Sequence, residues 1–299
     1  MKKSDPSSPR VVCFGEMLYD YLPNGRFPGG APMNVALHLQ QQGVATRFIS
    51  SVGQDEDGDA LLGYLAERGL PTYLIQIDEV YPTGKVLADV TQSDNVKYDI
   101  LQPVAWDYIG MDEMLAEAVE TADMFLYGSL AARDEVTRQT LNTLLSLASQ
   151  SVFDVNLRAP HYTQKTVSSL LEQANMVKLN EEELAILAKW YFSAPPTEDT
   201  LYRLAETFAL ATVCLTKGAE GAVLLSDGQL WHQPGYPVKV VDTIGSGDAF
   251  LATLVRKLLQ GDAPQECLRY GCAVGAYVAS QPGATPLVDL QAIESMVNP

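Results

Sequence analysis

Apolar residues along this chain follow two alternating periods. Short β-branched segments, such as 11–15 and 46–52, have the length and composition of buried strands. Longer segments between them repeat apolar residues every three or four positions, as in 249–260, which is typical of helices. Strands that alternate with helices predict an α/β fold with a doubly wound, mostly parallel sheet, in a three-layer α/β/α sandwich.

The predicted elements follow one another regularly. Strands are expected at 11–15, 46–52, 124–128, 151–157, 174–179 and 211–215, with a hairpin at 223–231 around the Asp227-Gly228 turn. Helices are expected up to Gly43 and at 60–68, 111–121, 134–149, 181–192, 249–260 and 264–280. Ligands of such folds bind at the carboxyl ends of the strands, so polar residues just after strands are the first candidates for a site.

Residues 73–102 interrupt this rhythm. Alternating segments there, such as 85–91, are separated by a Ser93-Asp94-Asn95 turn and not by helices. We expect a small separate sheet whose strands are inserted at about 17–28 and 73–105 into a single α/β domain of residues 11–299. Residues 1–10 are polar and contain prolines, which predicts a disordered tail.

Composition narrows the class of protein. The 299 residues are 47% hydrophobic and carry a formal net charge of −17, which argues against nucleic acid and anionic membrane surfaces as partners. No apolar run reaches the length that spans a membrane. The four cysteines show no CxxC spacing, which indicates buried free thiols in a reducing, cytoplasmic setting. The three histidines are scattered, so a histidine-rich metal site is not expected.

The stretch 240–250, VVDTIGSGDAF, combines a strand end, a glycine turn and a helix start. Backbone N–H groups at Gly245, Ser246 and Gly247 would surround one concavity at the positive end of a helix dipole, which is an anion site. Such donors stabilise a phosphoryl group during transfer, and Asp248 at the rim can accept the proton of an attacking hydroxyl. The alternative is that Asp248 only caps the helix.

Further polar residues stand where strands end. Asp20 follows the first strand and Asn34 follows a pair of glycines; taken alone, they are a loop carboxylate and a helix N-cap. Arg158 ends another strand, where its guanidinium either clamps phosphate or sugar oxygens or stays exposed without a role. Asn180 and Glu183 have the spacing of a capping box at a helix start.

Together these motifs resemble the ribokinase-like, or PfkB-type, carbohydrate kinases. The segment DTIGSGD at 242–248 is similar to the family signature, with Ser246 in place of the usual alanine. The segments GGAPMN at 29–34, DVNLR at 154–158 and NEEE at 180–183 also match family motifs. The resemblance runs from about residue 11 to 296. It implies the ribokinase-like fold, in which a small β-sheet lid covers the sugar and often forms a homodimer contact.

The resemblance also implies roles for the matched residues. Asp248 would be the catalytic base, with Gly245, Ser246 and Gly247 on the transferred phosphoryl group. The sugar would be held by Asp20, Gly29, Gly30, Asn34, Arg158 and Asp248, and ATP by Asn180, Thr216, Lys217, Gly218, Gly245 and Gly247. Glu183 would organise Mg²⁺ through water, and Asp242 is the candidate ligand of a monovalent cation. Leu287 stands where some members have a serine ligand, so a K⁺ requirement stays open.

Within the family, the segments GEMLYD, GGAP and DVNLR are most similar to fructokinases. We therefore expect ATP-dependent phosphorylation of a primary hydroxyl, converting fructose to fructose 6-phosphate. Other substrates stay open: 2-keto-3-deoxygluconate, whose carboxylate can pair with Arg158; tagatose; a nucleoside; and ribose, against which Ala31 counts because ribokinases have lysine there. A non-catalytic sugar- or nucleotide-binding protein of the same fold is a further alternative, although a binder has no need for Asp248. The chain has no P-loop, dinucleotide fingerprint or protein-kinase motif set.

Overall fold

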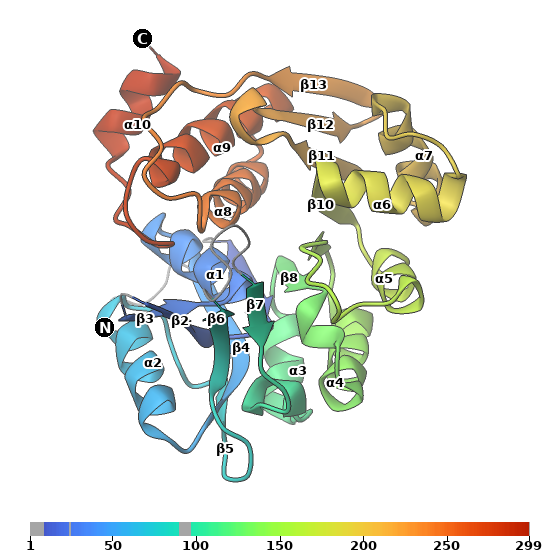
Figure 1. Cartoon of the computed structure of the whole chain (residues 1–299). Helices are drawn as coiled ribbons and strands as arrows, with labels where there is room; N and C mark the ends of the chain where they lie inside the picture. The colour runs from blue at the N-terminus through green and yellow to red at the C-terminus, as the bar shows by residue number, and fades with distance from the viewer. Residues whose placement is uncertain (1–8, 24, 90–96, 299) are drawn as a thin grey trace.

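The computed structural model describes residues 9–23, 25–89 and 97–298. Its main element is a nine-stranded sheet of order β13-β12-β11-β10-β9-β8-β1-β4-β5 (Figure 1). Its strands are β1 (Arg10–Phe14), β4 (Ala45–Gly53), β5 (Ile75–Asp78), β8 (Met124–Gly128), β9 (Ser151–Asp154), β10 (Met176–Asn180), β11 (Thr212–Thr216), β12 (Ala222–Ser226) and β13 (Gln229–Gln233). Neighbours from β11 to β5 pair in parallel, and β12 and β13 pair antiparallel at one edge. The predicted mostly parallel sheet is confirmed.

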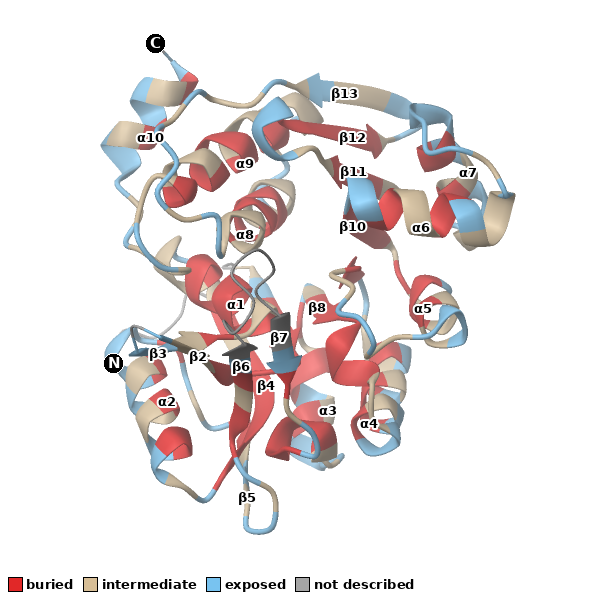
Figure 2. Cartoon of the chain, viewed as in Figure 1, coloured by how far each residue is buried: buried red, intermediate tan, exposed pale blue. Residues whose placement is uncertain are grey.

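Helices cover both faces of this sheet. They are α1 (Ala31–Gln41), α2 (Glu56–Glu67), α3 (Glu113–Glu120), α4 (Glu135–Leu147), α5 (Gln164–Leu171), α6 (Glu181–Phe192), α7 (Glu198–Phe208), α8 (Ser246–Leu259), α9 (Pro264–Ala279) and α10 (Leu290–Val297). The strands alternate apolar side chains between two cores: Val12 and Phe14 of β1 join the core with α3 to α7, whereas Val11 and Cys13 join the core with α1, α2, α8 and α9. Figure 2 shows the buried strands between helices that are exposed on their outer sides. The predicted three layers are therefore present.

The strand order reverses beside β1. The chain leaves β1 for β4 on one side and later returns to β8 on the other side. In open α/β sheets such a switch point leaves a crevice at the carboxyl ends of the strands, where ligands bind. Residues 15–20 follow β1 at this crevice.

A second sheet has four strands in the order β3-β2-β6-β7, which follow one another across Figure 1. They are β2 (Leu18–Leu22), β3 (Gly25–Gly29), β6 (Gly84–Asp89) and β7 (Lys97–Ile100). Three of its side chains meet one buried carboxylate of α2: Asp57 accepts a hydrogen bond from the Tyr21 hydroxyl at 2.8 Å and forms ion pairs with Arg26 and Lys85. These contacts fix the small sheet on the core.

Some predicted boundaries were wrong. Residues 75–78, predicted in the small sheet, form β5 and pair with β4 at the edge of the large sheet. Helix α2 begins at Glu56 and not at residue 60, because the Asp55 side chain accepts the Gly58 N–H at 2.8 Å and caps the helix. Strand β9 ends at Asp154 and not at residue 157, because Asn156 has a φ of 35°, which a strand cannot contain.

Other predictions have different outcomes. Helices α5, α7 and α10 had not been predicted. The Ser93-Asp94-Asn95 turn and residues 1–8 of the predicted tail lie outside the described residues, and Arg10 belongs to β1. All four cysteines are buried and free, as predicted. Among the described helices, none is long and apolar enough to cross a membrane.

His38 joins α1 to the loop 282–286. Its ring is fully buried, and its Nε2 lies 3.0 Å from the carbonyl oxygen of Ala284, so Nε2 must carry the hydrogen and donate it. Its Nδ1 has no partner among the described residues. Burial lowers the pKa of His38 to about 4, so the ring is neutral in the folded protein near pH 7.

We predict that His38 makes stability depend on pH. The unfolded ring takes up a proton near its ordinary pKa of 6.5, whereas the folded ring stays neutral down to about 4. The free energy of unfolding should therefore fall by about 3 kcal/mol as the pH drops through this range. His38→Gln keeps an N–H donor without a titrating ring, so urea denaturation should show a pH dependence that is weaker by this amount. His232→Gln, at an exposed histidine, is the control; equal pH dependence of wild type and His38→Gln would contradict the prediction.

Candidate active site

The glycine turn at 245–247 leads directly into α8. Gly245 is the N-cap with a φ of 78°, and a Cβ there would collide with the carbonyl group of Ala284, so this position requires glycine. The helix begins at Ser246, three residues before the predicted start. Residues 246–248 therefore form its first turn, where N–H groups have no acceptor inside the helix.

Backbone donors at this turn are free for a ligand. The N–H of Ser246 donates to the Thr243 carbonyl oxygen at 3.3 Å. Among the described residues, no acceptor pairs with the N–H groups of Gly245, Gly247 and Asp248. Three donors at the positive end of the α8 dipole have the geometry of an anion site. Asp248 contributes an amide to it in place of Ser246.

The carboxylate of Asp248 contacts Asn34, the last residue of the GGAPMN segment at 29–34. Asn34 donates from Nδ2 to Asp248 Oδ2 at 2.9 Å. Burial raises the pKa of Asp248 to about 6, against the positive charge of Lys178 and this hydrogen bond, which lower it. Such a carboxylate is mostly ionised at pH 7 and accepts a proton more readily than an exposed aspartate does.

Gly30 allows α1 to begin where Asn34 can reach Asp248. It is the N-cap of α1 with a φ of 116°, and a Cβ there would collide with the Glu16 carbonyl group. The alternative reading of Asn34 as a helix N-cap is therefore wrong, because Asn34 lies inside the first turn. Its Oδ1 has no partner among the described residues.

Three charged groups gather beside this first turn of α1. Asp20 lies in β2, and its carboxylate sits so close to Gly29 that any side chain at position 29 would collide with it. Burial raises the pKa of Asp20 to about 6 and that of Glu16 to about 7, and the positive charge of Arg158 lowers both. Arg158 is exposed and forms none of the ion pairs found in the described part of the chain. The Arg158 guanidinium is therefore free to bind a ligand near the carboxylates of Glu16 and Asp20.

Glu183 positions the Arg158 segment and also caps α6. One of its carboxylate oxygens accepts the Asn180 N–H at 2.8 Å and the other accepts the Leu157 N–H at 2.9 Å. Asn180 Oδ1 in turn accepts the Glu183 N–H at 2.9 Å, so the predicted capping box is confirmed. Each oxygen of this buried side chain already accepts one backbone hydrogen bond, which leaves one lone pair on each oxygen for a water ligand of a metal ion.

No group of three or more His, Cys, Asp or Glu side chains in the described part of the chain could hold a metal ion by itself. The residues present fit Mg²⁺ only as an ion that arrives on nucleotide phosphates and keeps most of its water ligands.

A pocket of about 980 Å³ opens beside the start of α8. Its lining includes Asn180, Thr216, Gly218 and Gly247, which the sequence had indicated as nucleotide-binding. Ser246, predicted to contact the transferred phosphoryl group, also lines the pocket. Sequence reasoning missed other lining residues of this pocket, which include Tyr236, Val238, Cys272 and Ala276. The volume is sufficient for a nucleotide, since ligand pockets commonly measure about 300–1,000 Å³.

Three predicted residues, Gly245, Lys217 and Asp242, do not line this pocket. Lys217 forms an ion pair with Glu220 at 3.5 Å. Asp242 fastens the glycine turn to the loop 282–286, because its Oδ1 accepts the Ile244 N–H at 2.9 Å and its Oδ2 accepts the Gly283 N–H at 3.3 Å. A monovalent cation at Asp242 would have to share these oxygens with two backbone donors.

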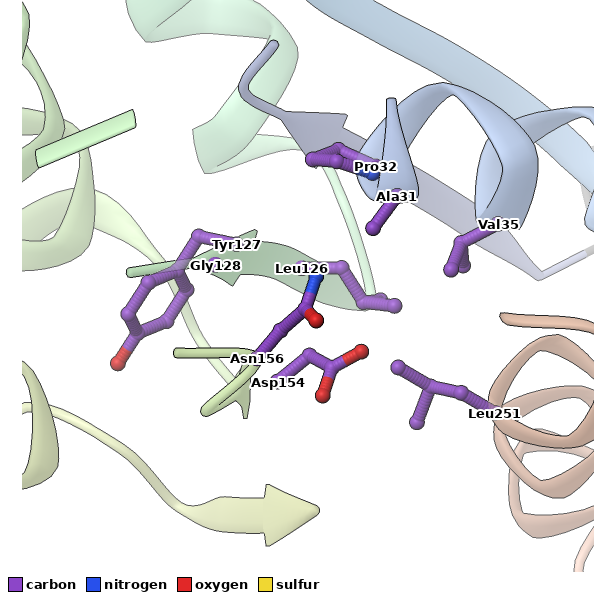
Figure 3. Close-up of a pocket in the computed structure, with 9 residues that line it drawn as sticks. All are labelled: Ala31, Pro32, Val35, Leu126, Tyr127, Gly128, Asp154, Asn156 and Leu251. Carbon is purple, nitrogen blue, oxygen red and sulfur yellow. The ribbon is translucent and has the colours of Figure 1, made fainter. Parts of the chain in front are cut away.

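Sequence reasoning also missed charged residues behind the glycine turn. Lys178 of β10 and Asp154 of β9 form a nearly buried ion pair at 3.0 Å. Asp154 and Asn156 line a small cavity between the end of β8 and helices α1 and α8 (Figure 3). A signal for this pair was present, since Lys178 interrupts the apolar part of β10 and Asp154 follows two buried apolar residues at the end of β9. Glu16 likewise interrupts an apolar segment, and its Oε2 has no partner among the described residues.

Comparisons with known proteins agree with this geometry. The family model described as pfkB family carbohydrate kinase matches residues 9–290. Probable fructokinase-6, chloroplastic, of Arabidopsis thaliana is 28% identical over 312 residues, covering 95% of this chain and 80% of that protein. A fructokinase from Vibrio cholerae, solved with fructose, ADP and calcium ion, has the same fold with a TM-score of 0.83 at 23% identity, covering 98% of this chain and 100% of the other.

A sugar kinase from Pyrococcus horikoshii, solved in complex with ATP, is 26% identical with a TM-score of 0.79, covering 96% of this chain and 99% of the other. The family match spans nearly the whole chain, including the glycine turn at the start of α8 and the residues that end β1, β9 and β10. This chain therefore belongs to the pfkB family of carbohydrate kinases.

Proposed function

We propose that this protein transfers the γ-phosphoryl group of ATP to a primary hydroxyl of fructose, forming fructose 6-phosphate and ADP. The observation that carries the proposal is the hydrogen bond of 2.9 Å between Asn34 and Asp248. This bond supports the proposal because it joins the partly buried carboxylate of Asp248, in the first turn of α8, to Asn34 of α1, next to the proposed sugar-binding residues.

In the proposed reaction, the acceptor hydroxyl lies against Asp248. The hydroxyl oxygen forms a bond to the γ-phosphorus while the bond from that phosphorus to the β,γ-bridging oxygen breaks, and the hydroxyl proton passes to Asp248. The free N–H groups of Gly245, Gly247 and Asp248 face the charge on the phosphoryl oxygens and stabilise it. Mg²⁺, when bound with ATP, neutralises phosphate charge, and Glu183 would orient its water ligands.

The nucleotide is proposed to occupy the large pocket. Asn180, Thr216 and Gly218 line this pocket together with Ser246 and Gly247 of the anion site, and Tyr236 and Ala276 line it too. With its phosphates at the start of α8, the nucleotide would have its nucleoside in the remaining part of the same pocket. Gly245 does not line the pocket, but its conformation allows the turn that presents the backbone donors. Lys217 would add positive charge near the phosphates. Asp242 would hold K⁺ in addition to its two backbone donors.

The sugar is proposed to lie between the small sheet and α1. Asp20, with its carboxylate over Gly29, would accept hydrogen bonds from sugar hydroxyls, and Arg158 would donate to sugar or phosphate oxygens. Fructose is the first choice because curated relatives at 28% identity are fructokinases. The free guanidinium of Arg158 favours 2-keto-3-deoxygluconate as the second candidate, since it would pair with the sugar carboxylate.

A substrate panel tests this proposal. We expect ADP release from Mg-ATP with fructose, and ³¹P NMR should show the phosphate on the C6 hydroxyl. Ribose, tagatose, 2-keto-3-deoxygluconate and adenosine should turn over more slowly. If the wild-type protein turns over 2-keto-3-deoxygluconate alone, that sugar and not fructose is the substrate. If the wild-type protein binds sugar but turns over none of the panel, the proposal that it is a kinase is contradicted.

The role of Asp248 is tested by substitution. Asp248→Asn should lose turnover by about 10²–10⁴-fold while it still binds fructose.

The pH dependence of turnover provides a second prediction. The turnover number at saturating fructose and Mg-ATP should fall about tenfold per pH unit below pH 6, because Asp248, with its pKa of about 6, is protonated there and cannot accept the hydroxyl proton. Asp20 also has a pKa of about 6, so Asp20→Asn is the discriminating variant. It should weaken fructose binding and keep the fall in rate at the same pH. A fall that disappears in Asp20→Asn would assign the titration to Asp20 and contradict the prediction.

A further inference from the structure

A buried pair of charges lies behind the proposed base. Lys178 stands outside the matched motifs, and Asp154 is the first residue of the DVNLR motif but has no role in the proposed reaction. Lys178 Nζ donates to Asp154 Oδ1 at 3.0 Å and to Oδ2 at 3.1 Å. The two side chains are 10% and 9% exposed. They face each other because β9 and β10 are parallel neighbours in which Lys178 and Asp154 stand in register. The strand pairing therefore fixes the geometry of the ion pair.

The fold itself gains little from this pair. Removal of two charges from water costs several kcal/mol per ion, and apolar residues of similar size often stabilise a core as well or better. The same face of these strands is otherwise apolar, with Val152 of β9 and Met176 of β10 in the core under α8 and α9. A role beyond folding would explain why charges stand at this end of the strands.

The pair lies directly under the start of α8. The Lys178 ammonium is 3.4 Å from the position that a Cβ of Gly247 would occupy, and Gly247 precedes Asp248. Figure 3 shows the Asp154 carboxylate at the small cavity, across from Leu251 of α8, and Ala31 and Val35 of α1 line the same cavity. These apolar neighbours screen charge poorly, so the field of the pair reaches Asp248 with little loss.

Charged and polar groups face Asp248 from several elements. Lys178 of β10 and Arg158 after β9 lower the pKa of Asp248, as does the hydrogen bond from Asn34 of α1, whereas Asp154 of β9 raises it. Glu16, after β1, interacts unfavourably with Asp248. Of the groups that lower the pKa, Lys178 has the largest effect.

We propose that Lys178 and Asp154 form a positioning pair that sets the proton affinity of Asp248. Lys178 keeps Asp248 ionised until the acceptor hydroxyl arrives, and Asp154 holds the ammonium in place and limits its effect, so that Asp248 remains able to accept a proton. This inference rests on the proposed role of Asp248 as the base, because it concerns how that base is tuned.

The test compares pH profiles of the turnover number in paired variants. Lys178→Met removes the attracting charge, so the fall in rate at low pH should move to higher pH. Asp154→Asn removes the opposing charge and keeps the shape of the side chain, so the fall should move to lower pH. Each shift should be about one pH unit, a tenfold change in proton affinity. The double variant should return towards the wild-type profile.

Lys257, in the last turn of α8, and Asp262, just after this helix, form an ion pair at 3.0 Å that provides matched controls. Lys257→Met and Asp262→Asn should leave the profile in place. The proposal is overturned if Lys178→Met and Asp154→Asn unfold cooperatively on heating, and are therefore folded, but have the same pH profile as wild type. If Lys178→Met does not fold, the pH profile of the isosteric variant Asp154→Asn is sufficient to test the proposal. Wild-type turnover in Asp248→Asn would instead refute the proposed base, so the two failures are distinguishable.

Discussion

The hydrogen bond between Asn34 and Asp248 is the constraint on which this site depends. It joins residues 214 positions apart at 2.9 Å, and it forms only if α1 and α8 begin at their observed residues. Gly30 and Gly245 ensure this, because each adopts a backbone conformation that favours glycine and lies against a carbonyl group that a Cβ would displace. The two glycine turns thus allow one hydrogen bond to connect the proposed sugar site with the proposed phosphate site.

Local charge dominates the chemistry of the site. A net charge of −17 repels ATP at long range, so binding must rely on close donors. The first turn of α8 supplies backbone amides, and Arg158 and Lys178 supply positive charge. Burial raises the pKa values of Glu16, Asp20 and Asp248, so these carboxylates accept protons more readily than exposed ones do. The same arrangement makes the site sensitive to pH.

Sequence patterns predicted local features well and distant contacts poorly. The glycine turn before Asp248 and the capping box at Asn180 are local, because a few neighbouring residues determine each. The register that pairs Lys178 with Asp154 depends on two strands and could not be read from either one. The second hydrogen bond of Glu183, to Leu157, and the transfer of residues 75–78 to the large sheet likewise depend on tertiary packing.

The most direct test of the account is a double-mutant cycle of the turnover number with Asn34→Ala, Asp248→Asn and the combined variant. If Asn34 acts by holding the Asp248 carboxylate, its removal matters only while that carboxylate is present. The account predicts that the double variant turns over as slowly as Asp248→Asn alone. Losses that multiply in the double variant would show that the two residues act independently, and would contradict the claim that this hydrogen bond organises the site.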